Sequence, residues 1–200
     1  GSWQDAAKLY RNPDFTIVTC AVDCPYRGKF FYPITDPGTA SDDRNYFNRA
    51  LVCVQELLEK RESVLVHCVS GVNRSAAIVI SFLMKQSNLS LVDAFNLVKA
   101  ARRHINPCDQ QLLFASNAAG FFPGKIDRSG FTQFAHTEHE AIVDKVYQEI
   151  LCRRADPDGL MHYSEEIAVG RMNEDTLRRC LINSKEYKIK LVNFSQDGRS

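Results

Sequence analysis

The sequence predicts an α/β domain followed by a small all-helical domain. Strand-like and helix-like patterns alternate over the first 120 residues, whereas only helical periodicity follows residue 137. The residues between them, 120–137, are rich in Gly, Pro and small polar side chains, which is typical of a linker. We therefore expect an α/β domain over residues 1–122, a linker over 123–137 and a helical module over 138–200.

Local patterns predict the strands and helices of the α/β part. Aromatic and β-branched residues mark the strands, and apolar residues at helical spacing mark the helices. The segment after Ser90 also carries a capping sequence, because Asp93 follows the serine by three residues. In chain order we expect a helix at 3–10, strands at 15–20 and shortly before Asp36, a helix at 43–60, a strand at 64–66, and helices at 75–85 and 90–103.

Composition and charge exclude several classes of protein. The formal net charge is +1, so no field of the whole molecule attracts nucleic acid or a membrane surface. No apolar run is long enough to span a bilayer, no signal peptide is visible, and the seven cysteines do not form the pattern of a secreted disulfide scaffold. We expect a soluble intracellular protein without a membrane or nucleic-acid partner. Gly1-Ser2 is typical of an expression-tag remnant, so we expect the natural N-terminus to be missing.

Cys20 and Cys24 have the spacing of a metal or redox pair. No second pair and no histidine cluster completes such a site, so packing in the core or in a loop is the favoured interpretation. We expect no metal and no other cofactor.

The segment from His67 to Ser75, with the sequence HCVSGVNRS, carries the chemistry. It joins a predicted buried strand to a predicted helix, so main-chain N–H groups and the helix dipole favour an oxyanion there. The thiol of Cys68 should lose its proton easily in that field, and Arg74 can bind two phosphate oxygens at once. These residues predict a phosphate-binding loop with a nucleophile at its base. The alternative is that Cys68 is an ordinary buried thiol at a strand end.

This segment resembles the active-site signature of the cysteine-dependent protein phosphatases, specifically of their small dual-specificity branch. The resemblance covers about residues 5–122. It implies a central sheet flanked by helices, with the loop at the carboxyl end of a central strand. It also implies two chemical steps, in which Cys68 attacks phosphorus and water then hydrolyses the phosphocysteine. The residues expected to bind phosphate are Val69, Ser70, Gly71, Val72, Asn73 and Arg74.

Such a mechanism needs an acid for the leaving group and later a base for water. The candidate is Asp36, which lies 32 residues before Cys68 on a loop bounded by Pro and Gly, where the family carries its general acid. The alternative is a turn residue, since Asp before Pro-Gly is a common turn signal. Asp42 and Asp43 are more typical of the start of the following helix.

Other residues near the loop have expected supporting roles. In the family, the hydroxyl at the position of Ser75 bonds the cysteine sulfur and helps the phosphoenzyme to break down, although it can also satisfy a helix-start N–H. His67 is expected to orient the loop from behind Cys68 and not to act as a base. Gly71 is expected for a positive φ or for close approach of the backbone to phosphate. Arg102 and Arg103 have two interpretations, recruitment to a phosphosubstrate or a solvated helix end, of which the second is the more common.

The composition of the loop bears on the substrate. None of residues 69–73 is Lys or Arg, whereas an inositol phospholipid headgroup requires additional positive charge, so a phosphoprotein is favoured. The resemblance implies a shallow pocket that admits phosphoserine and phosphothreonine as well as phosphotyrosine. The sequence departs from the family in two places: no additional strand precedes Trp3, and the usual Asn and aromatic after Pro107 are replaced by a shortened segment from Cys108 to Gln111.

The tail resembles a small helical domain of unknown function found mainly in bacterial proteins and similar to phycobilisome linker modules. Arg154 would occupy the first ligand position of a calcium loop, so the segment 156–159 predicts a helix-capping turn instead. We expect a scaffold or partner-binding module, with helices near 160–169, 174–183 and 184–191. The matching residues are Tyr147, Leu151, Arg154 to Gly159, Tyr163, Gly170 and Ser184 to Tyr187.

Three functions are compatible with the sequence. The favoured one is a dual-specificity protein phosphatase, because the nucleophile, the arginine and a candidate acid are all present. The alternatives are a non-catalytic phosphoresidue-binding module and an RNA 5′-phosphatase, for which no basic groove with aromatic residues is evident. A catalytic thiolate requires a reducing compartment, so we expect the cytoplasm, with the nucleus also compatible.

Overall fold

The computed structural model describes residues 1–133 and 137–189. The chain divides into two compact units, Gly1–Gln133 and Phe134–Ser200. The first is an α/β unit and the second is all-helical, so the predicted fold class is confirmed. None of the helices in the described ranges is long and apolar enough to cross a membrane.

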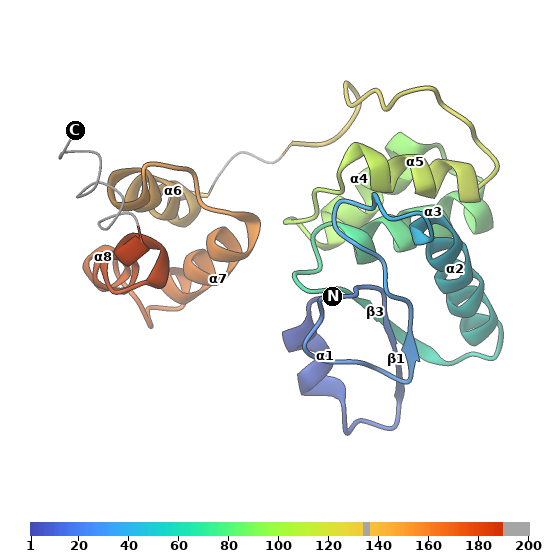
Figure 1. The fold of residues 1–200 in the computed structure, drawn as a ribbon, viewed down its shortest axis with the longest axis horizontal. Helices are drawn as coiled ribbons and strands as arrows, with labels where there is room; N and C mark the ends of the chain where they lie inside the picture. Colours follow the sequence, from blue (N-terminus) through green and yellow to red (C-terminus); the bar gives the residue numbers. More distant parts are fainter. Residues whose placement is uncertain (134–136, 190–200) are drawn as a thin grey trace. The chain divides into compact units, whose positions relative to one another are not determined.

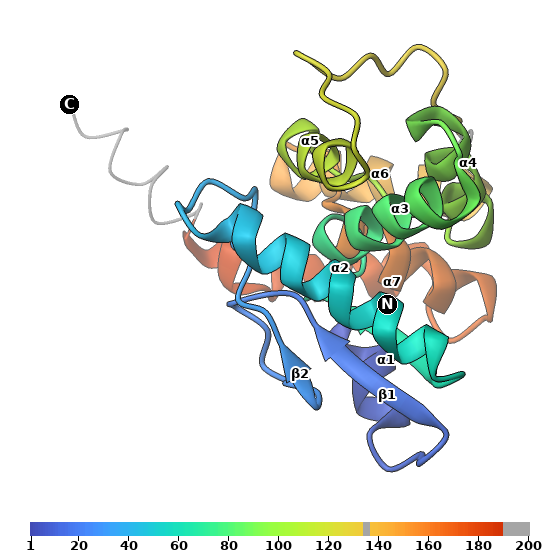
Figure 2. The ribbon, with the colours of Figure 1, turned by 90° about the vertical axis from the view of Figure 1, so that its right-hand side faces the viewer.

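A three-stranded parallel sheet forms the centre of the α/β unit; β1 and β3 are labelled in Figure 1 and β2 in Figure 2. The strands β1 (Phe15–Thr19), β2 (Phe30–Phe31) and β3 (Ser63–His67) lie in the order β2-β1-β3. At the carboxyl end of β1, Thr19 pairs with Phe31 on one side and with His67 on the other. Because parallel strands end at the same edge, the segments that follow all three strands meet there.

Helices cover both faces of the sheet (Figures 1 and 2). The helix α1 (Trp3–Leu9) lies against β3 on one face, and α2 (Asp43–Glu59) and α3 (Arg74–Ser87) lie on the other. Two further helices, α4 (Leu91–Ala101) and α5 (Asp109–Ala118), pack on the far side of α3. The predicted helices and strands are therefore confirmed within a few residues at each end.

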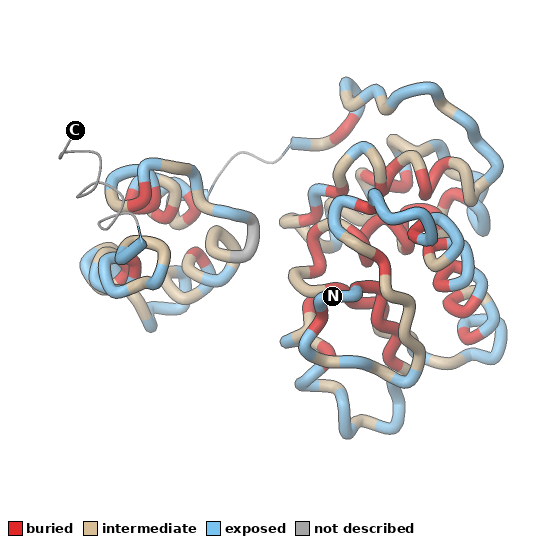
Figure 3. The backbone as a smooth tube through the Cα atoms, viewed as in Figure 1, coloured by how far each residue is buried: buried red, intermediate tan, exposed pale blue. Residues whose placement is uncertain are grey.

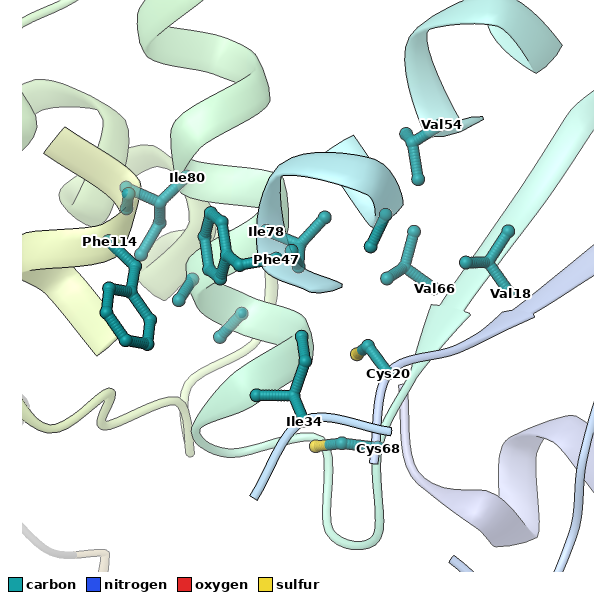
Figure 4. Close-up of a cluster of buried hydrophobic side chains, with 14 of the residues drawn as sticks. Val18, Cys20, Ile34, Phe47, Val54, Val66, Cys68, Ile78, Ile80 and Phe114 are labelled. Atoms are coloured by element: carbon teal, nitrogen blue, oxygen red, sulfur yellow. The ribbon is translucent and has the colours of Figure 1, made fainter. Parts of the chain in front are cut away.

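Enclosure on both sides explains the apolar sequence of α3. Eight of its fourteen residues are buried and none of residues 74–84 is exposed, whereas α2 has exposed positions along its whole length. Buried residues, red in Figure 3, concentrate on the inward sides of the helices and towards the carboxyl ends of β1 and β3. The core therefore reaches the sheet edge where the loops meet, and Figure 4 shows Cys68 and Ile34 at its border.

Part of the segment expected to be a linker packs on the first unit. Phe131 is buried and stacks on Phe95 of α4, with 4.2 Å between the ring centroids. Asn96 fastens the same segment, because it donates to the carbonyl of Gly130 at 3.0 Å and accepts from the N–H of Thr132 at 2.7 Å. The first unit therefore extends to Gln133, beyond the expected boundary at residue 122. Two apolar residues, Ile126 and Phe131, within a stretch of Gly, Pro and polar residues are not a sufficient sequence signal for this packing.

The helical unit has a core of its own. Its helices are α6 (Glu138–Leu151), α7 (Pro157–Ala168) and α8 (Glu174–Ile182), and residues 185–189 are also helical. The expected turn before α7 is confirmed, since the carboxylate of Asp156 accepts from the N–H of Gly159 at 2.9 Å. The end of the predicted helix 184–191 lies outside the described residues. The buried side chains of this core are Val143, Val146, Tyr147, Leu151, Leu177 and Leu181.

Candidate active site

The loop between β3 and α3 holds the predicted site at the carboxyl edge of the sheet. Gly71 has φ +72°, a conformation that disfavours other residues. A Cβ atom there would also lie 2.6 Å from the main-chain carbon of Gly1 and 2.9 Å from Nη2 of Arg102. Both conformation and close packing therefore require glycine at this position.

Cys68 is almost completely buried at the base of the loop, with 2% of its surface exposed. Its Sγ lies 3.3 Å from Oγ of Ser75 and accepts from the N–H of Gly71 at 3.3 Å. Burial alone raises the pKa of the thiol, but hydrogen bonds from Ser75 and Gly71 and the charge of Arg74 outweigh it. The pKa of Cys68 is therefore lower than usual, which favours the nucleophilic thiolate.

His67 is buried beneath the same loop. Its Nδ1 lies 3.1 Å from the carbonyl of Cys68, which can only accept, so Nδ1 carries the proton. Its Nε2 then accepts from the hydroxyl of Thr19 at 2.7 Å, while that oxygen accepts from the N–H of Gly28 at 2.7 Å. Burial lowers the pKa of His67, which favours this neutral form. The histidine thus ties β1 to β3 directly behind the cysteine.

Arg74 begins α3 and is also buried, with 2% of its surface exposed. Its Nη1 forms an ion pair with Asp23 and donates to the carbonyl of Ile34 at 3.2 Å, and its Nη2 lies 3.6 Å from Oδ2 of Asp36. Its Nε has no hydrogen-bond partner among the described residues, although it is buried. A buried guanidinium N–H without a partner is costly, and an anion bound in the loop would satisfy it.

Asp36 lies on the loop that follows β2, and its side chain is 44% exposed. Its Oδ1 accepts from Nδ2 of Asn73 at 2.6 Å. The main chain of this loop is fastened by Asp43, which is fully buried and accepts from the N–H of Thr35 at 2.8 Å, from its hydroxyl, and from the N–H of Ala40 at 2.7 Å. Asp42 takes the N-cap position of α2 without a side-chain capping bond. Of the two acids expected at this helix start, one therefore stabilises the loop of Asp36 instead of capping the helix.

Arg102 stabilises the loop between β3 and α3, the predicted phosphate loop, through main-chain carbonyl groups. Its Nε donates to the carbonyl of Gly71 at 3.2 Å, and its Nη2 donates to the carbonyl of Ser70 at 3.3 Å. Its guanidinium also forms an ion pair with Asp5 at 3.5 Å. This arginine is therefore a structural support of the loop, a role that differs from both interpretations available from the sequence.

The structure thus brings Cys68, Ser75, Arg74 and Asp36 to one edge of the sheet. It also brings Asp23 there, which sequence reasoning missed, and it gives the side chains of Asp43, Arg102 and Asn73 contacts that sequence reasoning did not predict. A signal for Asp23 was available, because an acid shortly after a parallel strand lies at the same edge as the loops after the other strands. For the other three no local pattern exists.

Cys20 and Cys24 belong to the buried cluster of the α/β unit. They therefore pack in the core, as favoured from the sequence. In the ranges that the structure describes, no group of three or more His, Cys, Asp or Glu side chains is arranged to hold a metal ion.

Comparisons with known proteins agree with this geometry. The family model "Dual specificity phosphatase, catalytic domain" matches residues 8–114, and "Domain of unknown function (DUF4214)" matches residues 129–191. Human dual specificity protein phosphatase 9 is 39% identical over 83 residues, which are 40% of this chain and 21% of that protein. Mouse dual specificity protein phosphatase 14 is 44% identical over 64 residues, 32% of each chain. The chain thus spans about a fifth of the length of the human relative.

A solved structure shares the fold. The crystal structure of a "mouse putative dual specificity phosphatase complexed with zinc tungstate" superimposes with a TM-score of 0.50 and 22% sequence identity. The match covers 60% of this chain and 80% of that one.

Proposed function

Since the chain belongs to the dual-specificity phosphatase family, we propose that it is a cysteine-dependent protein phosphatase that hydrolyses phosphotyrosine, phosphoserine and phosphothreonine through a phosphocysteine intermediate. One observation carries the proposal. A thiol with a lowered pKa lies beside a buried arginine whose Nε has no hydrogen-bond partner among the described residues. A nucleophile and a guanidinium N–H without a partner among the described residues, both in one loop, match the needs of a phosphate ester.

In the bound state, the phosphate takes its place in the loop above Cys68. Nε and Nη2 of Arg74 bind two of its oxygens, and the main-chain N–H groups of residues 69–74 bind the others. The ion pair between Arg74 and Asp23 fixes the other edge of the guanidinium, so that little side-chain freedom is lost when the substrate binds.

The first step transfers the phosphoryl group to sulfur. The thiolate of Cys68 forms the S–P bond while the bond from phosphorus to the leaving oxygen breaks. Asp36, in its protonated form, gives its proton to that oxygen, so the product leaves as a neutral alcohol or phenol.

The second step releases phosphate. Asp36, now a carboxylate, takes a proton from water as the water oxygen attacks phosphorus and the S–P bond breaks. The departing thiolate receives a hydrogen bond from the hydroxyl of Ser75, which lies 3.3 Å from the sulfur. Inorganic phosphate leaves and the enzyme regains its starting protonation state.

The substrate class follows from charge and from the family. The side chains of residues 69–73 include no cation, which favours a single phosphate group on a protein over a polyphosphorylated lipid headgroup. The chain acts in a reducing compartment, the cytoplasm or the nucleus, because the mechanism needs a free thiol. The helical unit, which matches a domain without an assigned function, serves as a partner-binding module.

The proposal is tested with purified protein under reducing conditions. Para-nitrophenyl phosphate should be hydrolysed, and Cys68→Ser should abolish turnover, while Cys180→Ser, an exposed cysteine of the helical unit, should not change it. Phosphotyrosine and phosphothreonine peptides should then be cleaved faster than a phosphoinositide or an RNA 5′-phosphate. Tight binding of phosphopeptide without turnover by the wild type would instead show a binding module.

A further inference from the structure

Asn73 occupies a helix N-cap without capping the helix. Asparagine is among the preferred N-cap residues because its side-chain oxygen accepts from an N–H of the first turn. At the start of α3 this bond is missing. Instead, Oδ1 of Asn73 accepts from the N–H of Cys108 at 2.9 Å, and Nδ2 donates to Oδ1 of Asp36 at 2.6 Å. The side chain therefore bridges the segments that carry Asp36 and Cys108.

The chemistry of its two partners determines the orientation of this amide. The N–H of Cys108 can only donate, so it must face the amide oxygen. The NH₂ group then faces Asp36, whose carboxylate accepts. A reversed amide would lose both hydrogen bonds, so Asn73 presents a fixed donor to the carboxylate.

The other contacts of the loop act on its main chain and not on the acid itself. Asp43 binds Thr35 and Ala40, and Gln111 donates to the carbonyl of Pro37 at 3.1 Å. The carboxylate of Asp36 contacts Asn73 and, at the longer distance of 3.6 Å, Arg74. When phosphate occupies the guanidinium of Arg74, the amide of Asn73 is the contact among the described residues that remains to orient the carboxylate.

We propose that Asn73 is a positioning residue that holds the carboxyl group of Asp36 over the phosphate loop, in reach of the leaving-group oxygen. The inference rests on the proposed function, because it assumes that Asp36 is the general acid. With Oδ1 held by the amide, Oδ2 faces the loop and carries the transferred proton. In the second step the same donor stabilises the carboxylate that activates water.

The test separates positioning of the acid from a role in folding. Asn73→Asp keeps the shape of the side chain and the acceptor for Cys108, but replaces the donor by a carboxylate that repels Asp36. Asn73→Ala removes both contacts. Asn106→Ala is the matched control, because this exposed asparagine lies in the segment between α4 and α5 and its side chain contacts Arg128 at 3.4 Å. The rate of phosphoenzyme formation is measured for para-nitrophenyl phosphate, a good leaving group, and for phenyl phosphate, a poor one.

Both Asn73 variants should slow phenyl phosphate by about tenfold, as expected when a catalytic group is displaced by a fraction of an ångström to an ångström. The rate with para-nitrophenyl phosphate should change by less than about twofold, because this leaving group scarcely needs an acid. In the Asp36→Asn background, Asn73→Ala should cause no further loss. Unfolding monitored by Trp3 fluorescence verifies that each variant is folded.

The inference would be overturned if the Asn73 variants slowed phosphoenzyme formation equally with both substrates, or if Asn73→Asp formed it at the wild-type rate. Asn73 would then have only a structural role, through its contact with Cys108. Failure of the underlying assignment looks different: Asp36→Asn itself would then slow both substrates equally. A selective loss in Asp36→Asn without one in the Asn73 variants keeps the acid and rejects its positioning by Asn73.

Discussion

The hydroxyl of Ser75 lies 3.3 Å from the sulfur of Cys68, and both side chains are 2% exposed. Ser75 is the second residue of α3, and its hydroxyl faces the sulfur of Cys68 from the helix side of the loop. This single contact contributes to both proposed steps, since it stabilises the thiolate before attack and again when it leaves.

Ser75→Ala is expected to raise the pKa of Cys68, because the mutation removes a hydrogen bond that now lowers it. The rate of alkylation by iodoacetamide should therefore reach its plateau at a higher pH than in the wild type. Breakdown of the phosphocysteine should slow by about tenfold or more, in the range of lost stabilisation of a developing charge. A burst of nitrophenol would then precede slow turnover. Ser87→Ala, exposed at the far end of α3, is the control, and an unchanged alkylation profile in Ser75→Ala would contradict the role of the serine.

Asp43→Asn should destabilise the loop that carries Asp36. The two carboxylate oxygens of Asp43 accept from the N–H groups of Thr35 and Ala40. In asparagine one of these oxygens is replaced by an NH₂ group, which cannot accept, so one of the two N–H groups loses its partner. We expect a loss of about 1–3 kcal/mol in the free energy of unfolding, as for buried hydrogen-bonding groups left without a partner. Turnover of phenyl phosphate should fall more than that of para-nitrophenyl phosphate.

Asp42→Asn is the matched control for this experiment. The residue is adjacent and exposed, and its side chain makes no capping bond. Unfolding by urea, followed by the fluorescence of Trp3, measures both variants in the first unit. Equal effects at the two positions would show that net charge near the loop matters and that the contacts of Asp43 do not.

Stability should decrease in mildly acidic solution because of His67. Burial lowers the pKa of this residue below its ordinary value of 6.5, so as the pH falls past that value the unfolded chain takes up a proton that the folded chain does not. Protons bound to the unfolded state favour unfolding, and the stability present above pH 6.5 is lost as the pH falls towards the folded pKa. In His67→Gln this part of the pH dependence should disappear, whereas His162→Gln, at an exposed position of α7, should retain it. The same slope in His67→Gln as in the wild type would refute the assignment.

The position of the domain boundary predicts how the chain can be shortened. A fragment ending at Gln133 should hydrolyse para-nitrophenyl phosphate as the full chain does, while one ending at Lys125 should be less stable. The shorter fragment lacks Phe131, and loss of a buried phenyl ring costs about 3–5 kcal/mol. Phe131→Ala in the full chain should show the same loss, whereas Phe122→Ala, 80% exposed, should not. Equal unfolding midpoints of the two fragments would place the boundary nearer residue 122.

Local sequence was sufficient for the central parts of the site. Cys68, Gly71, Arg74 and Ser75 lie within eight residues, so one strand–loop–helix segment determines their relative positions. The apolar strand before the loop and the apolar helix after it could be recognised from the order of apolar residues in the sequence. Most helices and strands could be predicted for the same reason, because periodicity and capping are properties of short segments.

Contacts between distant segments could not be predicted in this way. Arg102 lies 31 residues from Gly71 and Asp43 eight residues from Thr35, and in both cases a polar side chain reaches a main-chain group that no pattern identifies. The burial of Phe131 against Phe95 likewise depends on where the chain returns after α5.

Local propensities and contiguous residues were enough to predict the fold class and to identify Cys68 and Arg74 as the candidate nucleophile and phosphate-binding arginine. The groups that surround these two residues depend on how distant segments pack together. The parallel sheet brings Asp23 and Asp36 to Arg74, and the packing of α5 directs the amide of Asn73 towards the acid and not into its own helix. A side chain forms hydrogen bonds with the partners that the fold brings within reach, and these partners belong to segments that are far apart in the chain.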